Sequence, residues 1–125
     1  MCERVVVLGH SYGGPIVNAA IKGLSDKGVL GMIALSAFIF PSGMDQGAAI
    51  RATGDSPYVT LDSPSEGLLL PKDPNRTEWA IQQIRPRSMA ANMDIVPPQA
   101  WEDDSYAGKL GYFRCTADVV LPIKK

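Results

Sequence analysis

Residues 9–14 read Gly-His-Ser-Tyr-Gly-Gly and contain the pattern G-x-S-x-G. The pattern follows the apolar run at residues 5–8 and precedes a stretch with helical spacing of apolar residues, so it falls where a strand turns into a helix. A serine on so sharp a turn has a strained backbone and projects its hydroxyl above the sheet, where it can attack an acyl carbon. We therefore predict that Ser11 is a nucleophile and that the backbone N–H of Tyr12 donates to the developing oxyanion.

The glycines of the motif have a steric explanation. Strand and helix must pass each other closely at such a turn, so we expect a Cβ at either Gly9 or Gly13 to clash. Two other interpretations are a Gly-rich turn with an inert serine and a phosphate-binding loop. The phosphate-binding loop is excluded because no Lys-Ser or Lys-Thr pair follows and the G-x-G-x-x-G spacing is absent. The inert turn stays open at this point.

The elements that must position this motif follow from the pattern of apolar residues. Three β-branched or apolar runs predict parallel strands at about residues 4–8, 29–36 and 110–116, the first of them buried on both faces. A helix at residues 16–24 makes the crossover between the first two strands. Eight of the ten prolines lie between positions 41 and 98, which indicates loops and short helices there. One longer helix is predicted at residues 78–93, kinked or broken by Pro86. The fold class is α/β.

Residues 5–20 resemble the nucleophile elbow of the α/β-hydrolase superfamily, in a form common among its esterase-like and hydroxynitrile-lyase-like members. Residues 35–43 are similar to the segment that lines the acyl pocket in this family. That similarity makes Phe38 and Phe40 candidate pocket residues, together with His10 beside the elbow, although packing in the core is the simpler role for the two phenylalanines.

Residues 110–122 resemble the strand and loop that deliver the acid of the catalytic triad. The resemblance implies that Asp118 is this acid. Asp45, which follows the second strand, is the alternative, because some hydrolase families place the acid there. The segments implied are a nucleophile-elbow unit at residues 1–40, a cap-like segment at 41–108, and a strand with the acid loop at 109–125.

The function implied by the resemblance is hydrolysis of carboxylic esters or related small acyl substrates through an acyl-enzyme on Ser11. Alternatives are a hydroxynitrile-lyase-like member, a ligand-receptor-like member with little turnover, and a non-catalytic remnant. Haloalkane dehalogenases and epoxide hydrolases are disfavoured, because their elbow carries an aspartate where this chain has Ser11. The resemblance implies no cofactor.

The chain departs from the family pattern at its histidine. The family places the catalytic histidine after the acid, whereas the one histidine here is His10, whose side chain we expect to point away from the serine and pack behind it. We therefore expect the 125 residues to be a central piece of the fold that is not a competent enzyme by itself. The first strand would then lack its usual neighbour, and its open edge would favour self-association.

Composition narrows the class of protein further. The chain has 125 residues and a formal net charge of −1, which gives no electrostatic case for nucleic acid or an anionic membrane surface. No apolar run approaches the length of a membrane span. The two cysteines, Cys2 and Cys115, are too few for a disulfide scaffold, so we expect free thiols, a cytoplasmic location, and Cys115 buried on the third strand. A metal site is not expected, and the expected partner is a small-molecule substrate.

Overall fold

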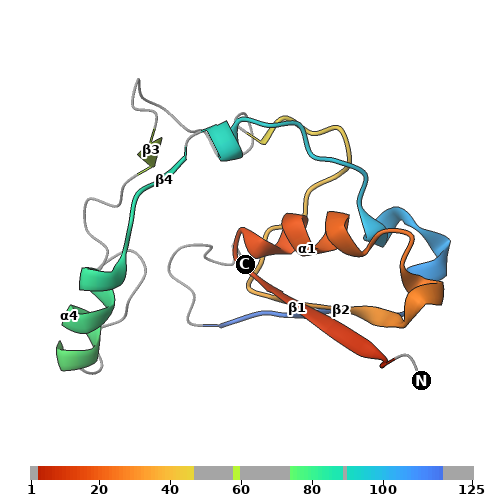
Figure 1. Ribbon diagram of the computed structural model, residues 1–125, viewed down its shortest axis with the longest axis horizontal. Helices are drawn as coiled ribbons and strands as arrows, with labels where there is room; N and C mark the ends of the chain where they lie inside the picture. The colour runs from red at the N-terminus through yellow and green to blue at the C-terminus, as the bar shows by residue number, and fades with distance from the viewer. Residues whose placement is uncertain (1–2, 47–57, 60–73, 89, 117–125) are drawn as a thin grey trace.

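The computed structural model describes residues 3–46, 58–59, 74–88 and 90–116. Its centre is a parallel three-stranded sheet made by β1 (Val5–His10), β2 (Val29–Leu35) and β5 (Leu110–Phe113). The strand order is β1-β2-β5, so β2 pairs with both of the others (Figure 1). The three strands and the α/β class predicted from the sequence are confirmed.

Helix α1 (Gly13–Ile21) makes the crossover from β1 to β2. It begins three residues earlier than its apolar spacing predicted, because the elbow opens directly into helix. It ends at Ile21, and Gly23 follows with a φ of +72°, a backbone conformation that glycine adopts at no steric cost. A short 3₁₀ turn, η1 (Ser25–Lys27), then leads into β2.

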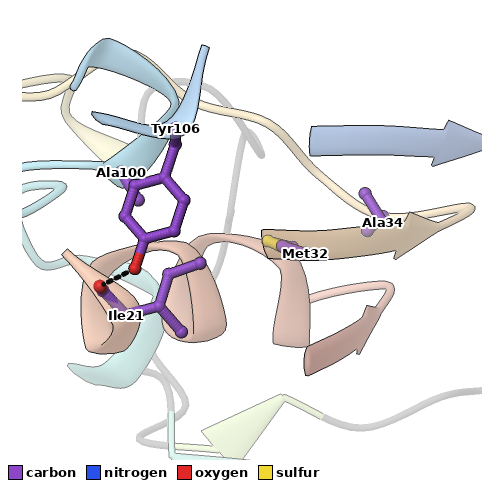
Figure 2. Packing of buried hydrophobic residues seen from close by; sticks show 6 residues of the cluster. Ile21, Met32, Ala34, Ala100 and Tyr106 are labelled. Carbon is purple, nitrogen blue, oxygen red and sulfur yellow. Dashed lines mark hydrogen bonds between the residues drawn. The ribbon is translucent and has the colours of Figure 1, made fainter. Parts of the chain in front are cut away.

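The core lies on one face of the sheet, between the strands and a layer made by α1 and two 3₁₀ turns, η3 (Ala100–Glu102) and η4 (Asp104–Tyr106). Figure 2 shows Tyr106 reaching from η4 across this layer, with its hydroxyl donating to the Ile21 carbonyl at 2.7 Å. The Ile21 carbonyl, in the last turn of α1, also accepts from the Leu24 N–H at 3.0 Å, so Tyr106 is its second donor. Burial raises the pKa of the Tyr106 hydroxyl above its usual value of 10.0. The cluster comprises Ile21, Met32, Ala34, Ala37, Ala100 and Tyr106.

The opposite face of the sheet is open among the described residues. Val6 and Leu8 of β1 are 54% and 56% exposed, and Phe113 of β5 is 65% exposed. On this face, Leu8 of β1 pairs with Ile33 of β2, and Leu35 of β2 pairs with Phe113 of β5. The expectation that the first strand is buried on both faces was wrong, because β1 is an edge strand whose second face meets no described element.

The cap-like segment contains short elements that lie apart from the sheet in Figure 1. Two-residue strands β3 (Tyr58–Val59) and β4 (Arg87–Ser88) pair antiparallel. Helix α4 spans Pro74–Gln83, and the turn η2 spans Ala90–Asn92. The predicted helix at 78–93 was therefore wrong in both bounds.

Proline explains both bounds of α4. Pro74 occupies the first helical position, where its missing N–H has no partner to lose. Pro86 disfavours helical backbone in the residue before it, and α4 has ended by Gln83. Among the described residues, no helix has the length and apolar character that a membrane crossing requires.

Candidate active site

Ser11 follows the last residue of β1 and has a φ of +52°, in the left-handed region that side-chain-bearing residues rarely adopt. Hydrogen bonds fix both its backbone N–H and its carbonyl. The Ser11 N–H donates to the Leu35 carbonyl at 3.4 Å, and the Ser11 carbonyl accepts from the N–H groups of Gly14 and Phe38, each at 3.1 Å. The serine of the motif thus occupies the strained strand-to-helix turn that the sequence predicted.

The crowding expected at the motif's glycines is found at Gly9. A Cβ there would lie 2.9 Å from the Gly13 carbonyl oxygen and 3.0 Å from Met32 Cε. At Gly13 the expectation was wrong, since a Cβ would meet nothing within 4 Å. The tight position is Gly14, whose Cβ would lie 2.3 Å from the Phe38 carbonyl oxygen. Helix α1 is crowded by the segment after β2, a contact that no local pattern could reveal.

Tyr12 immediately precedes α1, with φ −62° and ψ −19°. Its backbone N–H therefore belongs to the group of donors at the helix start, which suits a developing negative charge. The Tyr12 side chain also makes a contact, which the motif does not predict. The Tyr12 hydroxyl donates to the carbonyl of Ala91 in η2. This bond ties the residue after the nucleophile to the cap-like segment.

Ser36 lies directly beyond the end of β2 and was not singled out by the sequence. It is buried, it has a φ of +38°, and its N–H donates to the Phe113 carbonyl at 2.8 Å. The Ser36 Oγ accepts a hydrogen bond from the N–H of Cys115 at 3.1 Å. The carboxyl ends of the three parallel strands meet here, at the edge where open α/β sheets bind ligands.

Phe38 and Phe40 stack on each other, with ring centroids 5.4 Å apart and planes inclined by 16°. Phe40 is buried, and its carbonyl accepts from Trp101 Nε1 at 3.2 Å. A cavity of about 190 Å³ lies nearby, with Ile39, Trp101 and Tyr112 in its wall. Neither phenylalanine belongs to that wall, nor does Ser11. A pocket role for the two rings stays a prediction.

The remaining predicted residues of the site are His10, Asp45 and Asp118. His10 is exposed on the open face of the sheet, paired in register with Leu35, so it does not pack behind the nucleophile as expected. Asp45 is exposed and forms an isolated antiparallel bridge with Ile95. Asp118 lies outside the described residues.

Cys115 corrects another expectation. Its thiol is free and exposed, and it lies beyond the end of β5 instead of being buried on that strand. Within the described ranges, no group of three or more His, Cys, Asp or Glu side chains is arranged to hold a metal ion.

The charged groups with shifted pKa values lie away from the elbow, in η3 and the residue after it. Hydrogen bonds from the Ser42 side chain and backbone lower the pKa of Glu102, and those from Ser105 lower the pKa of Asp103. Lys22 Nζ donates to the Gln99 carbonyl at 3.2 Å. The Ser42–Glu102 and Lys22–Gln99 bonds connect the end of α1, the loop after β2 and η3, so their role is to hold the layer that supports the site, whereas the Ser105–Asp103 bond is local.

Comparison with known families agrees with the geometry. The model of the Alpha/beta hydrolase family matches residues 1–124. Searches of the curated proteins and of the solved structures find no match. The matched range includes all three parallel strands, the crossover helix and the strained serine between them. The chain belongs to the alpha/beta hydrolase family.

Proposed function

We propose that the protein is a serine hydrolase acting on carboxylic esters or related small acyl substrates, with Ser11 as its nucleophile. The observation that carries the proposal is the backbone of Ser11, which has a φ of +52° between a parallel strand and the helix that follows it. A serine without a role would favour a relaxed conformation, because a positive φ costs a side-chain-bearing residue about 1–3 kcal/mol.

The chemistry is an acyl transfer in two steps. Ser11 Oγ attacks the ester carbonyl, its proton passes through a base to the leaving alkoxide, and an alcohol departs from the acyl-enzyme. Water then attacks the acyl-enzyme, releasing the carboxylic acid and restoring the hydroxyl. The Tyr12 N–H donates to the oxyanion in both steps. In this proposal Asp118 orients the base, with Asp45 as the alternative acid.

The base is assigned to a histidine other than His10. His10 is the one histidine among the 125 residues, and it is exposed on the open face of the sheet. Residues at consecutive strand positions point to opposite faces, so its side chain is directed away from the α1 face. A partner subunit or further sequence of the same protein would supply the imidazole.

A fluorophosphonate probe tests the proposal, because it modifies an activated serine and leaves an inert one unmodified. The protein is expressed from its full reading frame, treated with the probe, and mapped by peptide mass spectrometry. We expect one adduct, on Ser11, that is absent in Ser11→Ala and present in Ser105→Ala, a control on the exposed turn η4. An unlabelled protein, or an adduct on another residue, would contradict the proposal.

A further inference from the structure

Two neighbouring strands of the sheet end in the same unusual way. Ser11 follows β1 with a φ of +52°, and Ser36 follows β2 with a φ of +38°; they are the two described residues other than glycine with a positive φ. The last pair of the β1–β2 ladder joins His10 with Leu35, so the two serines are neighbours in register. The proposed role of Ser11 as nucleophile accounts for its strained backbone, but it does not account for the strained backbone of Ser36.

Two hydrogen bonds join Ser36 to β5 and to the residues that follow it. That strand ends at Phe113, whose carbonyl accepts the Ser36 N–H at 2.8 Å. Beyond the ladder, the N–H of Cys115 donates to Ser36 Oγ at 3.1 Å. The Ser36 hydroxyl therefore accepts a backbone N–H as a carbonyl of β2 would. It extends the hydrogen bonding between the two chains to Cys115, two residues past the last ladder pair at Phe113. A left-handed backbone with a short polar side chain suits such a local bond.

The same segment holds the nucleophile from the other side. Leu35 accepts the Ser11 N–H through its carbonyl, and Phe38 donates its N–H to the Ser11 carbonyl. Residues 35–38 thus lie between the elbow and the end of β5, with hydrogen bonds to both. A change in the backbone at Ser36 would shift these two partners relative to each other.

We infer that Ser36 is a positioning residue that fixes the carboxyl end of β5 relative to the nucleophile elbow. The inference rests on the proposed function, because its purpose is to hold the chain leaving β5, which leads to Asp118 in the sequence, at a fixed place relative to Ser11. Ser36 itself takes part in no bond making or breaking.

Two substitutions separate the hydrogen bond from the backbone strain. Ser36→Gly accepts the positive φ freely but has no acceptor for the Cys115 N–H. Ser36→Asn also tolerates a positive φ and carries a carbonyl oxygen that can replace Oγ. Tyr112 donates its hydroxyl to the Ala37 carbonyl at 3.0 Å, a bond that neither variant removes, so the register of β5 is retained. Ser105→Ala is the control.

The first measurement is amide hydrogen exchange, which does not depend on activity. In Ser36→Gly we expect exchange at Cys115 to be about tenfold faster, the effect of one lost hydrogen bond, and exchange at Phe38 to rise with it. Ser36→Asn should restore both amides, and Ser105→Ala should change neither. Unchanged exchange at Cys115 or at Phe38 in Ser36→Gly would overturn the inference.

The second measurement is the rate at which the fluorophosphonate probe modifies Ser11 in the protein from its full reading frame. We expect Ser36→Gly to slow labelling by about ten- to a hundredfold, because displacing a reacting group by up to about 1 Å has an effect of this size. Ser36→Asn should restore most of the labelling rate. Labelling at the wild-type rate in Ser36→Gly would overturn the inference and leave the proposed function standing. An unlabelled wild type would reject the proposed function, and the exchange at Cys115 and Phe38 would then decide the role of Ser36.

Discussion

Gly13 and Gly14 are adjacent, yet the space around them differs. A Cβ at residue 14 would overlap the Phe38 carbonyl oxygen and lie 2.8 Å from Ala37 Cβ, whereas one at residue 13 would meet open space. We expect Gly14→Ala to lower the free energy of unfolding by about 1–3 kcal/mol through overpacking. Gly13→Ala should leave it unchanged or raise it by up to about 1 kcal/mol, because alanine favours helix over glycine.

Urea unfolding followed by circular dichroism measures both free energies under one set of conditions. The two variants make the same chemical change at neighbouring positions, so each is the control for the other. Equal unfolding free energies for Gly13→Ala and Gly14→Ala would contradict the contact between α1 and the segment after β2.

The residues of the site differed in how far they could be predicted. Ser11 was singled out because two glycines flank it at fixed spacing between a strand and a helix, and the strained turn was confirmed, whereas its role as nucleophile stays a prediction. Ser36 was not singled out because a single serine after an apolar run carries no pattern, and its hydrogen bond is with Cys115, which is remote in sequence. Gly13 was assigned the crowding that belongs to Gly14, since the crowding group is the Phe38 carbonyl. Contacts between segments far apart in sequence set these roles.

At the scale of elements, the loop after β2 is joined to η3 by one carboxylate. Glu102 accepts hydrogen bonds from the Ser42 hydroxyl and, at 2.8 Å, from the Ser42 N–H. These bonds lower the pKa of Glu102 below its usual value of 4.5. A carboxylate whose pKa is lower in the folded state stabilises the fold above its unfolded pKa, and this stabilisation is lost as pH falls through the folded pKa.

We therefore expect Glu102→Gln to lower the melting temperature near neutral pH, and this effect to shrink progressively as pH falls below 4.5, the usual pKa of a Glu carboxyl. Differential scanning fluorimetry from about pH 3 to pH 7 measures the difference between variant and wild type. Glu78→Gln, on the exposed helix α4, controls for the loss of a carboxylate. A difference between Glu102→Gln and wild type that stays constant with pH would refute the role of this bond.

The elements themselves were predictable where the apolar pattern was unbroken. The strands at β1 and β2 follow from β-branched and apolar runs, and the crossover helix follows from its spacing. The helix predicted at 78–93 was wrong because apolar residues continue at helical spacing past Pro86, and the backbone constraint of proline overrides that pattern. The two-residue strands β3 and β4 are too short to leave a periodic signal.

At the scale of the whole molecule, the open sheet face predicts association. Leu8 on the edge strand β1 and Phe113 on β5 share this face and are 56% and 65% exposed. An exposed apolar edge strand is a template for pairing with another chain, and a lysine on it opposes such pairing. We expect the purified 125-residue chain to elute as dimers or larger species, and Leu8→Lys to shift it toward the monomer.

Size-exclusion chromatography with light scattering measures the mass of each species. Ile16→Lys is a matched control, because Ile16 is also 56% exposed but lies on α1. A monomeric wild-type chain, or an equal shift caused by Ile16→Lys, would count against association through the sheet.

A second expectation at this scale concerns activity. The 125-residue chain alone should hydrolyse p-nitrophenyl acetate and butyrate no faster than its own Ser11→Ala variant. A serine hydroxyl is a weak nucleophile at neutral pH without an adjacent base, and loss of triad function reduces turnover by about 10⁶. The one histidine, His10, is exposed on the open sheet face. A rate that depends on Ser11 would show that a second copy of the chain supplies the base.

The central strand β2 pairs with one strand that is close to it in sequence and with one that is remote. β1, α1 and β2 are consecutive in sequence, whereas β5 joins β2 through the pairing of Met32 with Leu110, after a long intervening segment. The entropy of closing such a loop grows only with the logarithm of its length, by about 0.6 kcal/mol for each doubling. Within that segment, Ala37, Ala100 and Tyr106 belong to the core, so changes in length are tolerated in the part that carries α4, which lies apart from the sheet in Figure 1. Such changes in length leave the consecutive unit of β1, Ser11 and α1 unaltered.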